Sequence, residues 1–415
     1  MNVTILFFNI RNTIFTLNNS YYYLHPMETL IIIIEFVVFI FLAIQIAYLF
    51  FFSIAGKIYK MGKINTAGHL RRIRIIIPAY KEDAVIIETA RLATTHDYPK
   101  SLFEVVVIAD SLENKTLIEL RKLPITVHVV NFINSTKGKA LQKAIELTQK
   151  NSTDIALILD ADNHMSAGFL HKVNNAIDAG YKIIQGHRTA KKISTSFARL
   201  DACTEEINNH IFRKGHNAVG LPSALIGSGM AFEWSLFVGL LKDIGETTGE
   251  DKEIEIRAVR QGCEILFYHN AYVYDEKVPN ASVFSNQRSR WLATQGEFLS
   301  RYFRESLQQL KQGNLAFFNK VFQAFLLPRI MLLGSTGIIW VVAFFNSKLF
   351  FIGLSLLLIL LSTALLIALP FRWYNRKLLN ALLQIPIAYF SMLKAYIQIN
   401  KAKRSFIHTP HGETA

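Results

Sequence analysis

The sequence predicts an α/β domain set between membrane-spanning helices, and three observations support this class. Short runs rich in β-branched residues alternate with helical stretches over residues 72–276, which is typical of a mostly parallel sheet. Long apolar segments stand on both sides of that region. The mean hydropathy of +0.26 is also high for a wholly soluble chain. The length of 415 residues accommodates one ordinary soluble domain and several membrane helices.

Charge and cysteine content exclude some classes. The formal charge of +14 would suit nucleic acid, but much of it flanks apolar segments, where Lys and Arg set membrane topology. We therefore expect no nucleic-acid partner. The two cysteines, Cys203 and Cys263, lack C-x-x-C spacing. This argues against a disulfide framework or a cysteine zinc site and fits a reducing compartment.

The N-terminal region predicts a membrane anchor. Residues 28–54 are almost unbroken apolar, which is long enough for one helix to cross the bilayer. The basic residues that follow place the next domain on the cytoplasmic side of the cell (inner) membrane. Residues 1–27 form an extension that ends at Met27, and one hypothesis is that Met27 is the native start.

Residues 72–281 predict the α/β domain. Its expected helices include 138–150 and 166–179. Ligands of such folds bind beyond the carboxyl ends of the parallel strands. Asp110 and Asp160 each lie where an expected strand ends. The expected strands are Ile73–Ile77, Val105–Ala109, Thr126–Val130, Ile155–Leu159 and Lys182–Gln185.

The C-terminal part returns to the membrane. Residues 282–324 are aromatic, basic and amphipathic, which favours interfacial helices, although packing on the soluble domain explains any one of them equally well. Residues 325–345 and 349–370 predict two spanning helices. A third segment, 378–398, either spans or lies in the interface, and the basic tail 399–415 favours the interface because it would otherwise end outside.

The acidic pair Asp160 and Asp162 follows an expected strand. Carboxylates in such a turn suit Mg²⁺ or Mn²⁺, which prefer oxygen ligands and often share them with phosphates. A solvated turn or a helix cap is the alternative for this pair alone. Asp251 follows Gly249 and Glu250 at a helix start, where it either caps the helix or serves as a base.

The third constellation is Gln287-Arg288-Ser289-Arg290-Trp291. On a helix Gln287, Arg290 and Trp291 share one face. Arginine pairs with phosphate oxygens, and the apolar face of a tryptophan ring can stack against a sugar ring. The alternative is a basic interfacial helix with a Trp anchor. The Lys137–Lys139 turn suits a phosphate contact, and Gly227–Gly229 suits a tight turn near the acceptor; plain structural turns are the alternative for both.

Together these residues resemble the motifs of family 2 glycosyltransferases, in particular the membrane-embedded cellulose, hyaluronan and poly-N-acetylglucosamine synthases. The resemblance covers about residues 73–303. Ile77–Glu82 resembles the P-x-Y-N-E segment, with Lys81 where Asn is usual, and Phe406–Thr409 loosely resembles the tail motif F-x-V-T. Residues 287–291 resemble Q-x-x-R-W, which is tied to processive synthases but not confined to them.

The resemblance implies a GT-A fold, an inverting mechanism, a Mg²⁺ or Mn²⁺ cofactor and Asp251 as the catalytic base. It assigns Asp160 and Asp162 to the metal. It assigns acceptor binding to Glu250, Gln287 and Trp291. The residues that it assigns to the nucleotide-sugar are Pro78, Tyr80, Glu82, Asp110, Lys139, Asp160, Arg288 and Arg290.

The sequence therefore favours transfer of a hexose from a UDP-sugar to a growing β-linked polysaccharide, with coupled export and export subunits as further hypotheses. One alternative is transfer of a single sugar to a lipid acceptor, either a polyprenyl phosphate or a ceramide-like lipid. A second is a catalytically silent scaffold or translocation subunit. The lipid bilayer is an expected partner in each case.

Overall fold

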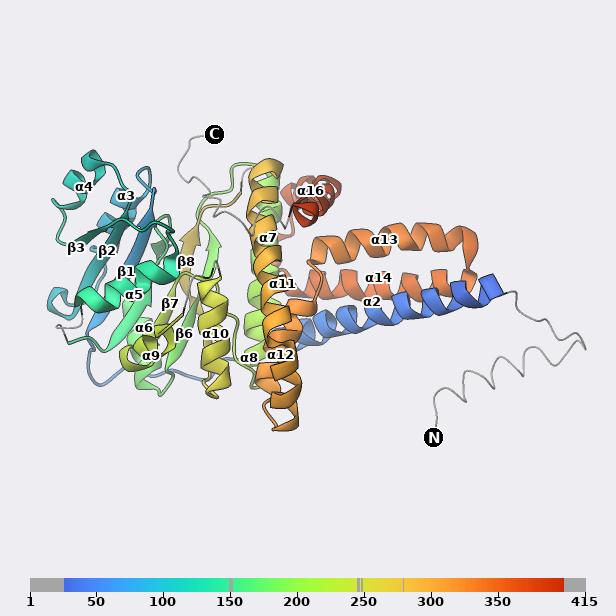
Figure 1. The fold of residues 1–415 in the computed structure, drawn as a ribbon, viewed down its shortest axis with the longest axis horizontal. Helices are drawn as coiled ribbons and strands as arrows, with labels where there is room; N and C mark the ends of the chain where they lie inside the picture. Colours follow the sequence, from blue (N-terminus) through green and yellow to red (C-terminus); the bar gives the residue numbers. More distant parts are fainter. Residues whose placement is uncertain (1–25, 149–151, 245–246, 248, 279, 399–415) are drawn as a thin grey trace, which may run out of the picture.

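The computed structural model describes residues 26–148, 152–244, 247, 249–278 and 280–398. The expectations for residues 1–25 and for the tail 399–415, including the match at Phe406–Thr409, lie outside these residues. A sheet domain, a layer of long helices and a projecting helix bundle follow one another along the molecule (Figure 1).

The described strands form one sheet of eight in the order β3-β2-β1-β4-β7-β6-β8-β5. Neighbouring strands β1, β2, β3 and β4 are parallel, and β6 is parallel to β8. This confirms the predicted α/β class with a mostly parallel, GT-A-like sheet. The strands are β1 (Ile73–Tyr80), β2 (Phe103–Asp110), β3 (Thr126–Val130), β4 (Ile155–Ile158), β5 (His164–Met165), β6 (Ile183–Ala190), β7 (Met230–Glu233) and β8 (Leu266–Asp275).

Two strands run against the others. β7 is antiparallel to both β4 and β6, and β5 is antiparallel to β8. Neither was expected from the sequence, because four residues in β7 and two in β5 are too short to show a periodic pattern. β7 separates the two parallel halves of the sheet.

Alternate strand residues pack on opposite faces of the sheet. Ile75 and Val107 belong to one core, while Ile76 and Val106 belong to the other. Both faces are buried, which explains why these strands are continuously apolar. The covering helices are α3 (Ile86–Ala93), α4 (Asn114–Leu120) and α6 (Phe169–Asp178) on the first face, and α5 (Lys137–Thr148), α9 (Trp234–Leu241) and α10 (Glu250–Arg260) on the second.

A layer of long helices separates the sheet from the bundle (Figure 1). Helix α11 (Ala281–Lys311) begins at Asn280, whose side chain accepts a hydrogen bond from Val283 N. Tyr302 and Phe317 join the core of the sheet domain, so this layer is attached to it. The other members are α7 (Ser196–Asn208), the π-helical η2 (Asn209–Lys214), α8 (Gly215–Asn217) and α12 (Leu315–Phe325).

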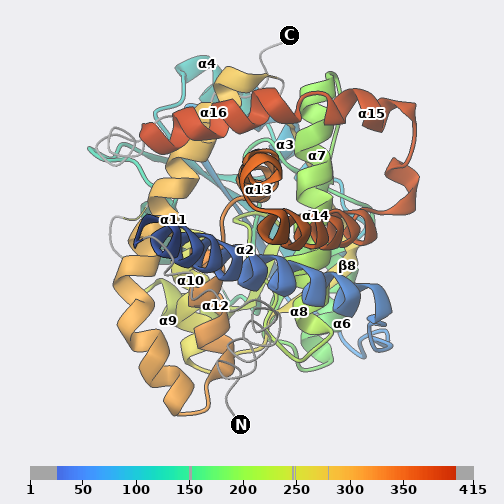
Figure 2. The ribbon, with the colours of Figure 1, turned by 90° about the vertical axis from the view of Figure 1, so that its right-hand side faces the viewer.

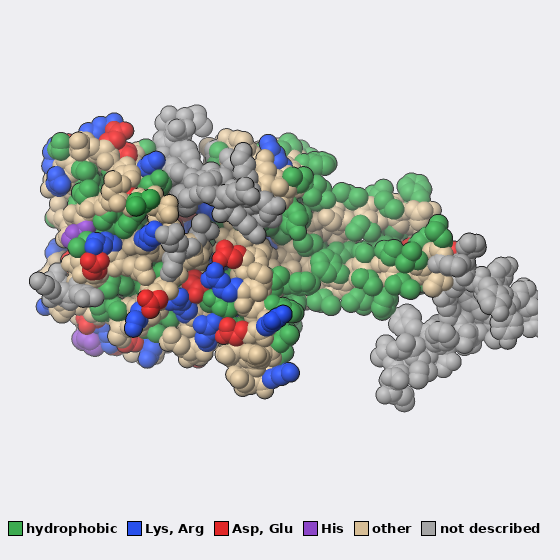
Figure 3. Space-filling model, viewed as in Figure 1, with side chains coloured by type: hydrophobic (Ala, Val, Ile, Leu, Met, Phe, Trp, Pro, Cys, Tyr) green, Lys and Arg blue, Asp and Glu red, His purple; other side chains and the backbone are tan. Residues whose placement is uncertain are grey.

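The bundle consists of α2 (Pro26–Ile58), α13 (Arg329–Asn346) and α14 (Lys348–Ala368). Its outer surface is hydrophobic, whereas charged side chains gather over the sheet domain (Figure 3). Its interior is filled by packed side chains such as Leu354 and Leu361. Each helix is long and apolar enough to cross a membrane.

The segment from α15 (Arg376–Leu382) to α16 (Ile385–Ile397) is a fourth candidate span by length and composition. Helix α16 nevertheless runs across the base of the bundle, roughly perpendicular to its axis (Figures 1 and 2). Gly334 of α13 permits this contact, because a Cβ there would lie 2.3 Å from the Tyr389 ring. This arrangement supports the interfacial interpretation of 378–398.

Candidate active site

A cavity of about 610 Å³ opens where β1, β2 and β4 end and continues to the base of the helix bundle. Of the site residues that the sequence predicted, all but one line it. Those that do are Pro78, Tyr80, Glu82, Asp110, Asp160, Asp162, Glu250, Asp251, Gln287, Arg288, Arg290 and Trp291.

The strand ends form the acidic rim of this cavity. Tyr80 and Asp110 stand opposite each other in the parallel register of β1 and β2. Lys81 adopts a positive φ of 56°, and its N–H donates to the Asp110 carbonyl at 3.1 Å. Asparagine adopts that conformation more easily than most residues, so lysine is a locally costly choice here.

The Lys137–Lys139 turn divides its two lysines between cavity and surface. The exception among the predicted residues is Lys139, whose ammonium donates to the Asn134 carbonyl outside the cavity. Lys137 lies inside, where its ammonium contacts the Asp160 carboxylate and donates to the Gly227 carbonyl at 2.6 Å. The structure therefore favours Lys137 over Lys139 for a phosphate contact.

Charge keeps Lys137 protonated. Burial lowers its pKa, but the negative charges of Asp160, Glu250 and Asp251 outweigh burial and raise the pKa overall. For Glu250 burial dominates: it raises the pKa to about 7 against the attraction of Lys137, and Asp251 adds to the rise.

The Gly227–Gly229 turn closes the cavity beside these groups. Gly227 has a φ of +86°, and a Cβ on it would lie 3.4 Å from Lys137 Nζ and 3.8 Å from Asp251 Oδ2. The turn also supports the acidic pair, because Ser228 Oγ accepts from Asp160 N at 3.0 Å. The Lys137 ammonium, the Asp251 carboxylate and the Gly227–Gly229 turn therefore lie close together.

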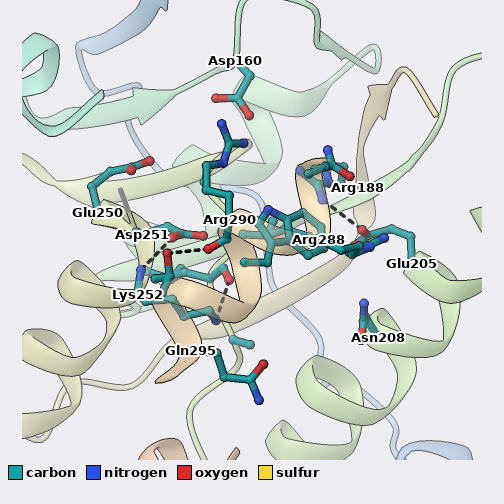
Figure 4. Close-up of a pocket in the computed structure, with 18 of the residues that line it drawn as sticks. Asp160, Arg188, Glu205, Asn208, Glu250, Asp251, Lys252, Arg288, Arg290 and Gln295 are labelled. Carbon is teal, nitrogen blue, oxygen red and sulfur yellow. Dashed lines mark hydrogen bonds and ion pairs between the residues drawn. The ribbon is translucent and has the colours of Figure 1, made fainter. Parts of the chain in front are cut away.

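Glycine brings α10 and α11 together. A Cβ on Gly249 would lie 2.3 Å from Thr294 Cγ2, so only glycine permits this approach. The contact places Asp251, in the first turn of α10, beside Arg290 of α11 (Figure 4). Burial lowers the pKa of Arg290, and the carboxylates Glu250, Asp251 and Asp160 oppose that shift.

Arg288 and Arg290 extend to different sides of α11 (Figure 4). Arg290 points toward Asp160, whereas Arg288 extends toward Glu205 and donates to Asp201 Oδ1 at 2.7 Å. The Arg288 guanidinium lies 3.9 Å from the centre of the Trp291 ring. The geometry therefore favours Arg290, and not Arg288, as the residue nearest a diphosphate at the acidic rim.

The helix α7 side of the cavity carries ion pairs that sequence patterns did not reveal. Arg188 pairs with Glu205 at 3.0 Å, and Arg213 shares that carboxylate at 3.4 Å. Lys277 pairs with Asp275 at 2.7 Å. These residues belong to no short motif, and the fold brings the segments around 188, 205–213 and 275–277 together.

The acidic pair Asp160 and Asp162 is the donor set that the sequence predicts for a metal. No group of three or more His, Cys, Asp or Glu side chains suited to a metal occurs in the part of the chain that the structure describes. Two carboxylates still suit Mg²⁺ or Mn²⁺, which commonly complete their coordination with water and substrate phosphates. The ammonium of Lys137 against Asp160 shows that a cation is accommodated at this carboxylate.

Comparison with known families agrees with this fold. Residues 71–294 match the family described as "Glycosyltransferase like family 2". The chain belongs to this family. The membrane-embedded polysaccharide synthases are one subgroup that the motifs resemble, and the match does not single them out.

The curated relatives carry the names of different glycosyltransferases. The probable glycosyltransferase YdaM of Bacillus subtilis is 22% identical over 60% of this chain and 60% of its own length. The β-monoglucosyldiacylglycerol synthase of Trichormus variabilis is 27% identical over 54% of this chain and 49% of its own. A probable glucomannan 4-β-mannosyltransferase of Oryza sativa is 24% identical over 53% and 40%. The chain thus spans about half the length of the curated relatives it matches.

Among solved structures, the mannosyltransferase PcManGT of Pyrobaculum calidifontis, in complex with GDP-Man and Mn²⁺, has the same fold. The TM-score is 0.51 at 15% identity, and the match covers 89% of this chain and 99% of that one. The likeness therefore extends beyond the sheet domain to most of the described helices.

Proposed function

We propose that the protein transfers a single sugar from a nucleoside diphosphate sugar to a lipid acceptor at the membrane surface, with inversion at the anomeric carbon. The observation that carries this proposal is the single cavity that joins the acidic rim, Asp251 and the base of the helix bundle. The donor is expected to be a UDP-sugar, as the resemblance implies, although PcManGT was solved with GDP-Man.

Each side chain has a distinct role in this proposal. Asp251 accepts the proton of the acceptor hydroxyl as that oxygen bonds to the anomeric carbon, which passes through an oxocarbenium-like state. Arg290 pairs with the departing diphosphate. Trp291, which is 39% exposed, presents its ring to the acceptor and fixes its position.

Asp160 and Asp162 would hold the divalent cation. When bound, such an ion neutralises charge that develops on the departing diphosphate. The ammonium of Lys137, which contacts Asp160, adds positive charge next to the acidic pair. Asp110 lines the cavity and would contact the nucleotide.

The lipid acceptor is supported by the membrane end of the cavity. Its walls there include Leu49 of α2, Leu326 and Leu327 before α13, and Met392 of α16. Such a lining suits an acyl or prenyl chain better than a sugar polymer. The β-monoglucosyldiacylglycerol synthase, whose printed name indicates a lipid product, is among the relatives.

A polysaccharide product is the second candidate. It is supported by Trp291, which occupies the position that Q-x-x-R-W provides in processive synthases. The filled interior of the bundle weighs against export through it, because Leu354, Leu361 and Ala364 are fully buried there. A silent scaffold is the least supported reading, since the acidic groups and Arg290 all line one cavity.

The proposal is tested by the Asp251→Asn variant. Loss of the base should reduce transfer by about 10²–10⁴-fold, because general base catalysis typically contributes that much. Binding of nucleotide to the purified protein should be retained, since the amide keeps the shape of the side chain. The measurement is release of nucleoside diphosphate with a panel of UDP- and GDP-sugars. Near-normal release by the variant would remove Asp251 as the base.

A further inference from the structure

Positive charge collects at the membrane end of the cavity, away from the acidic rim. One carboxylate there, Glu205, is shared between Arg188 and Arg213, and Asp201 is paired with Arg288. Arg329 also lines the cavity. The carboxylates on this side are therefore already engaged by other cations.

Arg329 has uncharged partners. Its guanidinium donates to Asn208 Oδ1 at 2.7 Å and to the Thr204 carbonyl at 3.1 Å. The Cζ atom of Arg329 also lies 5.8 Å from the centre of the Phe212 ring. Among the described residues no carboxylate lies within ion-pairing distance of it. A partly buried cation without a counter-charge is costly, and an anion in the cavity would relieve that cost.

The position of Arg329 is also informative. It is the first residue of α13, where the chain enters the helix bundle. Its cavity-lining neighbours Leu327, Pro328 and Ile330 are apolar. An anion that reaches Arg329 therefore lies at the boundary between an apolar chain and the polar cavity, as the phosphate of a lipid does.

Arg288 provides a second cation on the same side. It is 8% exposed, one of its amino groups pairs with Asp201, and its buried Nε has no hydrogen-bond partner. Its plane is fixed by the Trp291 ring beneath it. Figure 4 shows it extending toward Glu205 on the side of the cavity that Asn208 lines. Arg288 and Arg329 therefore line the same cavity as the reaction centre.

Together these groups describe a ligand. The cavity is lined by apolar residues and Arg329 where the chain enters the helix bundle, and by Arg288 and Trp291 of α11 and Asp251 of α10 at the reaction centre. A matching acceptor has an apolar tail, a phosphate, a polyol or sugar headgroup and a free hydroxyl. Its phosphate would serve for binding only, because a phosphate nucleophile would leave Asp251 without a proton to accept.

We propose that Arg329 and Arg288 bind the phosphodiester of a phospholipid acceptor whose headgroup carries the reactive hydroxyl. This inference rests on the proposed function. In the reaction the anomeric carbon–oxygen bond to the diphosphate breaks, and the electron pair leaves with the diphosphate. The headgroup oxygen forms the new bond to the anomeric carbon, and its proton passes to Asp251.

The test uses lipids with matched acyl chains and the purified full-length protein in detergent. Dioleoyl phosphatidylglycerol carries phosphate and hydroxyl, dioleoyl phosphatidic acid carries phosphate alone, and monoglucosyl dioleoylglycerol carries hydroxyls alone. Native mass spectrometry should show both phosphorylated lipids binding roughly tenfold more tightly than the neutral one, as one or two charge-assisted hydrogen bonds provide. Arg329→Gln should remove that preference, and Arg329→Lys should retain part of it.

The control is Arg304→Gln, which removes an exposed arginine of α11 without touching the cavity. It should leave lipid preference and nucleotide binding unchanged. If the neutral lipid binds wild type as tightly as the phosphorylated lipids, the inference is wrong. The same holds if Arg329→Gln and Arg304→Gln behave alike, or if an equal amount of the neutral lipid displaces phosphatidylglycerol. Lost nucleotide binding would show that Arg329→Gln does not fold. In that case the inference is tested by the lipid preference of wild type and by whether Arg329→Lys retains part of that preference.

The failure of the proposed function has a different signature. In that case no labelled sugar passes from any nucleotide-sugar to any lipid, whatever the lipid preference. If wild type and Arg329→Gln both transferred sugar to the neutral lipid as efficiently as to phosphatidylglycerol, the proposed function would stand and the phosphate site would be overturned.

Discussion

At the residue scale, the site places three carboxylates around two cations. Lys137 contacts Asp160 and lies 3.7 Å from Glu250, while Arg290 is close enough to Asp251 for their charges to interact. The two cations therefore offset part of the negative charge inside the cavity. Glu250 is the group for which compensation is incomplete, since its pKa rises to about 7.

Glu250 should therefore make stability depend on pH. Its pKa is near 4.5 in the unfolded chain and about 7 in the folded protein, so the folded state holds a proton that the unfolded chain releases between these values. Its contribution is fully present below about pH 4.5 and is lost as the pH rises through 7. We expect Glu250→Gln to remove this loss, worth on the order of 1–3 kcal/mol.

The measurement is the thermal unfolding midpoint of wild type and Glu250→Gln in detergent with EDTA, from pH 4.5 to 8. Glu146→Gln, which removes an exposed carboxylate, is the control and should follow wild type. Parallel pH profiles for wild type and Glu250→Gln would show that Glu250 titrates normally.

Sequence patterns located the acidic groups and Arg290, but not the lysine that pairs with Asp160. Asp160 and Asp162 stand after a buried strand, and Asp251 starts a helix, so local sequence already places them at element ends. Which lysine of Lys137–Lys139 faces the cavity depends on the rotation of α5, and no local pattern reveals it. The pairing of Asp201 with Arg288 depends on packing between helices that are distant in the chain.

At the element scale, Gly249 controls how closely α10 approaches α11. Gly249→Ala should push the two helices apart, because its Cβ would meet Thr294 Cγ2 at 2.3 Å. We expect transfer to fall at least about tenfold while the protein stays folded, since displacements near 1 Å in a reacting site cost up to about 10²-fold. The measurement is the rate of sugar transfer under saturating donor.

A second substitution tests the cause. Thr294→Ser removes the Cγ2 methyl group, so Gly249→Ala combined with Thr294→Ser should recover much of the lost rate. Gly239→Ala is the control, because a Cβ there meets nothing within 4 Å. No recovery in the double variant would place the effect elsewhere than in this contact.

The strands show where sequence reasoning succeeds and where it ends. β1 and β2 are continuously apolar because both of their faces are buried, and this signal is visible in one sequence. β7 carries no comparable signal, and it joins the sheet through pairing with β4 and β6. The GT-A-like class could thus be predicted, whereas the exact strand order required the structure.

At the scale of the whole molecule, a charged domain and an apolar bundle meet at the level of α16 and the membrane end of the cavity. The junction of α13 and α14, where α14 begins at Lys348, lies at the far end of the bundle, and α16 lies at its base. We propose that the basic residues after α2 lie on the cytoplasmic side, that the bundle crosses the membrane and that α16 stays on the cytoplasmic side.

Cysteine labelling tests this topology. In a chain with Cys203 and Cys263 replaced by serine, Lys348→Cys should react with a membrane-impermeant maleimide added to intact cells. Lys394→Cys on α16 is also exposed and should react only after permeabilisation. Labelling of Lys394→Cys in intact cells would show that residues 378–398 cross the membrane.

The most direct test of the account is the nature of the product. Purified protein is incubated with labelled nucleotide-sugars and membrane lipids, and the labelled material is separated into solvent-soluble lipid and insoluble polymer before mass analysis. We predict a solvent-soluble product one sugar residue heavier than its lipid precursor, formed in equal number to the nucleoside diphosphate released, and absent with Asp251→Asn. A labelled polymer of many sugars, or no incorporation with any donor, would contradict the account.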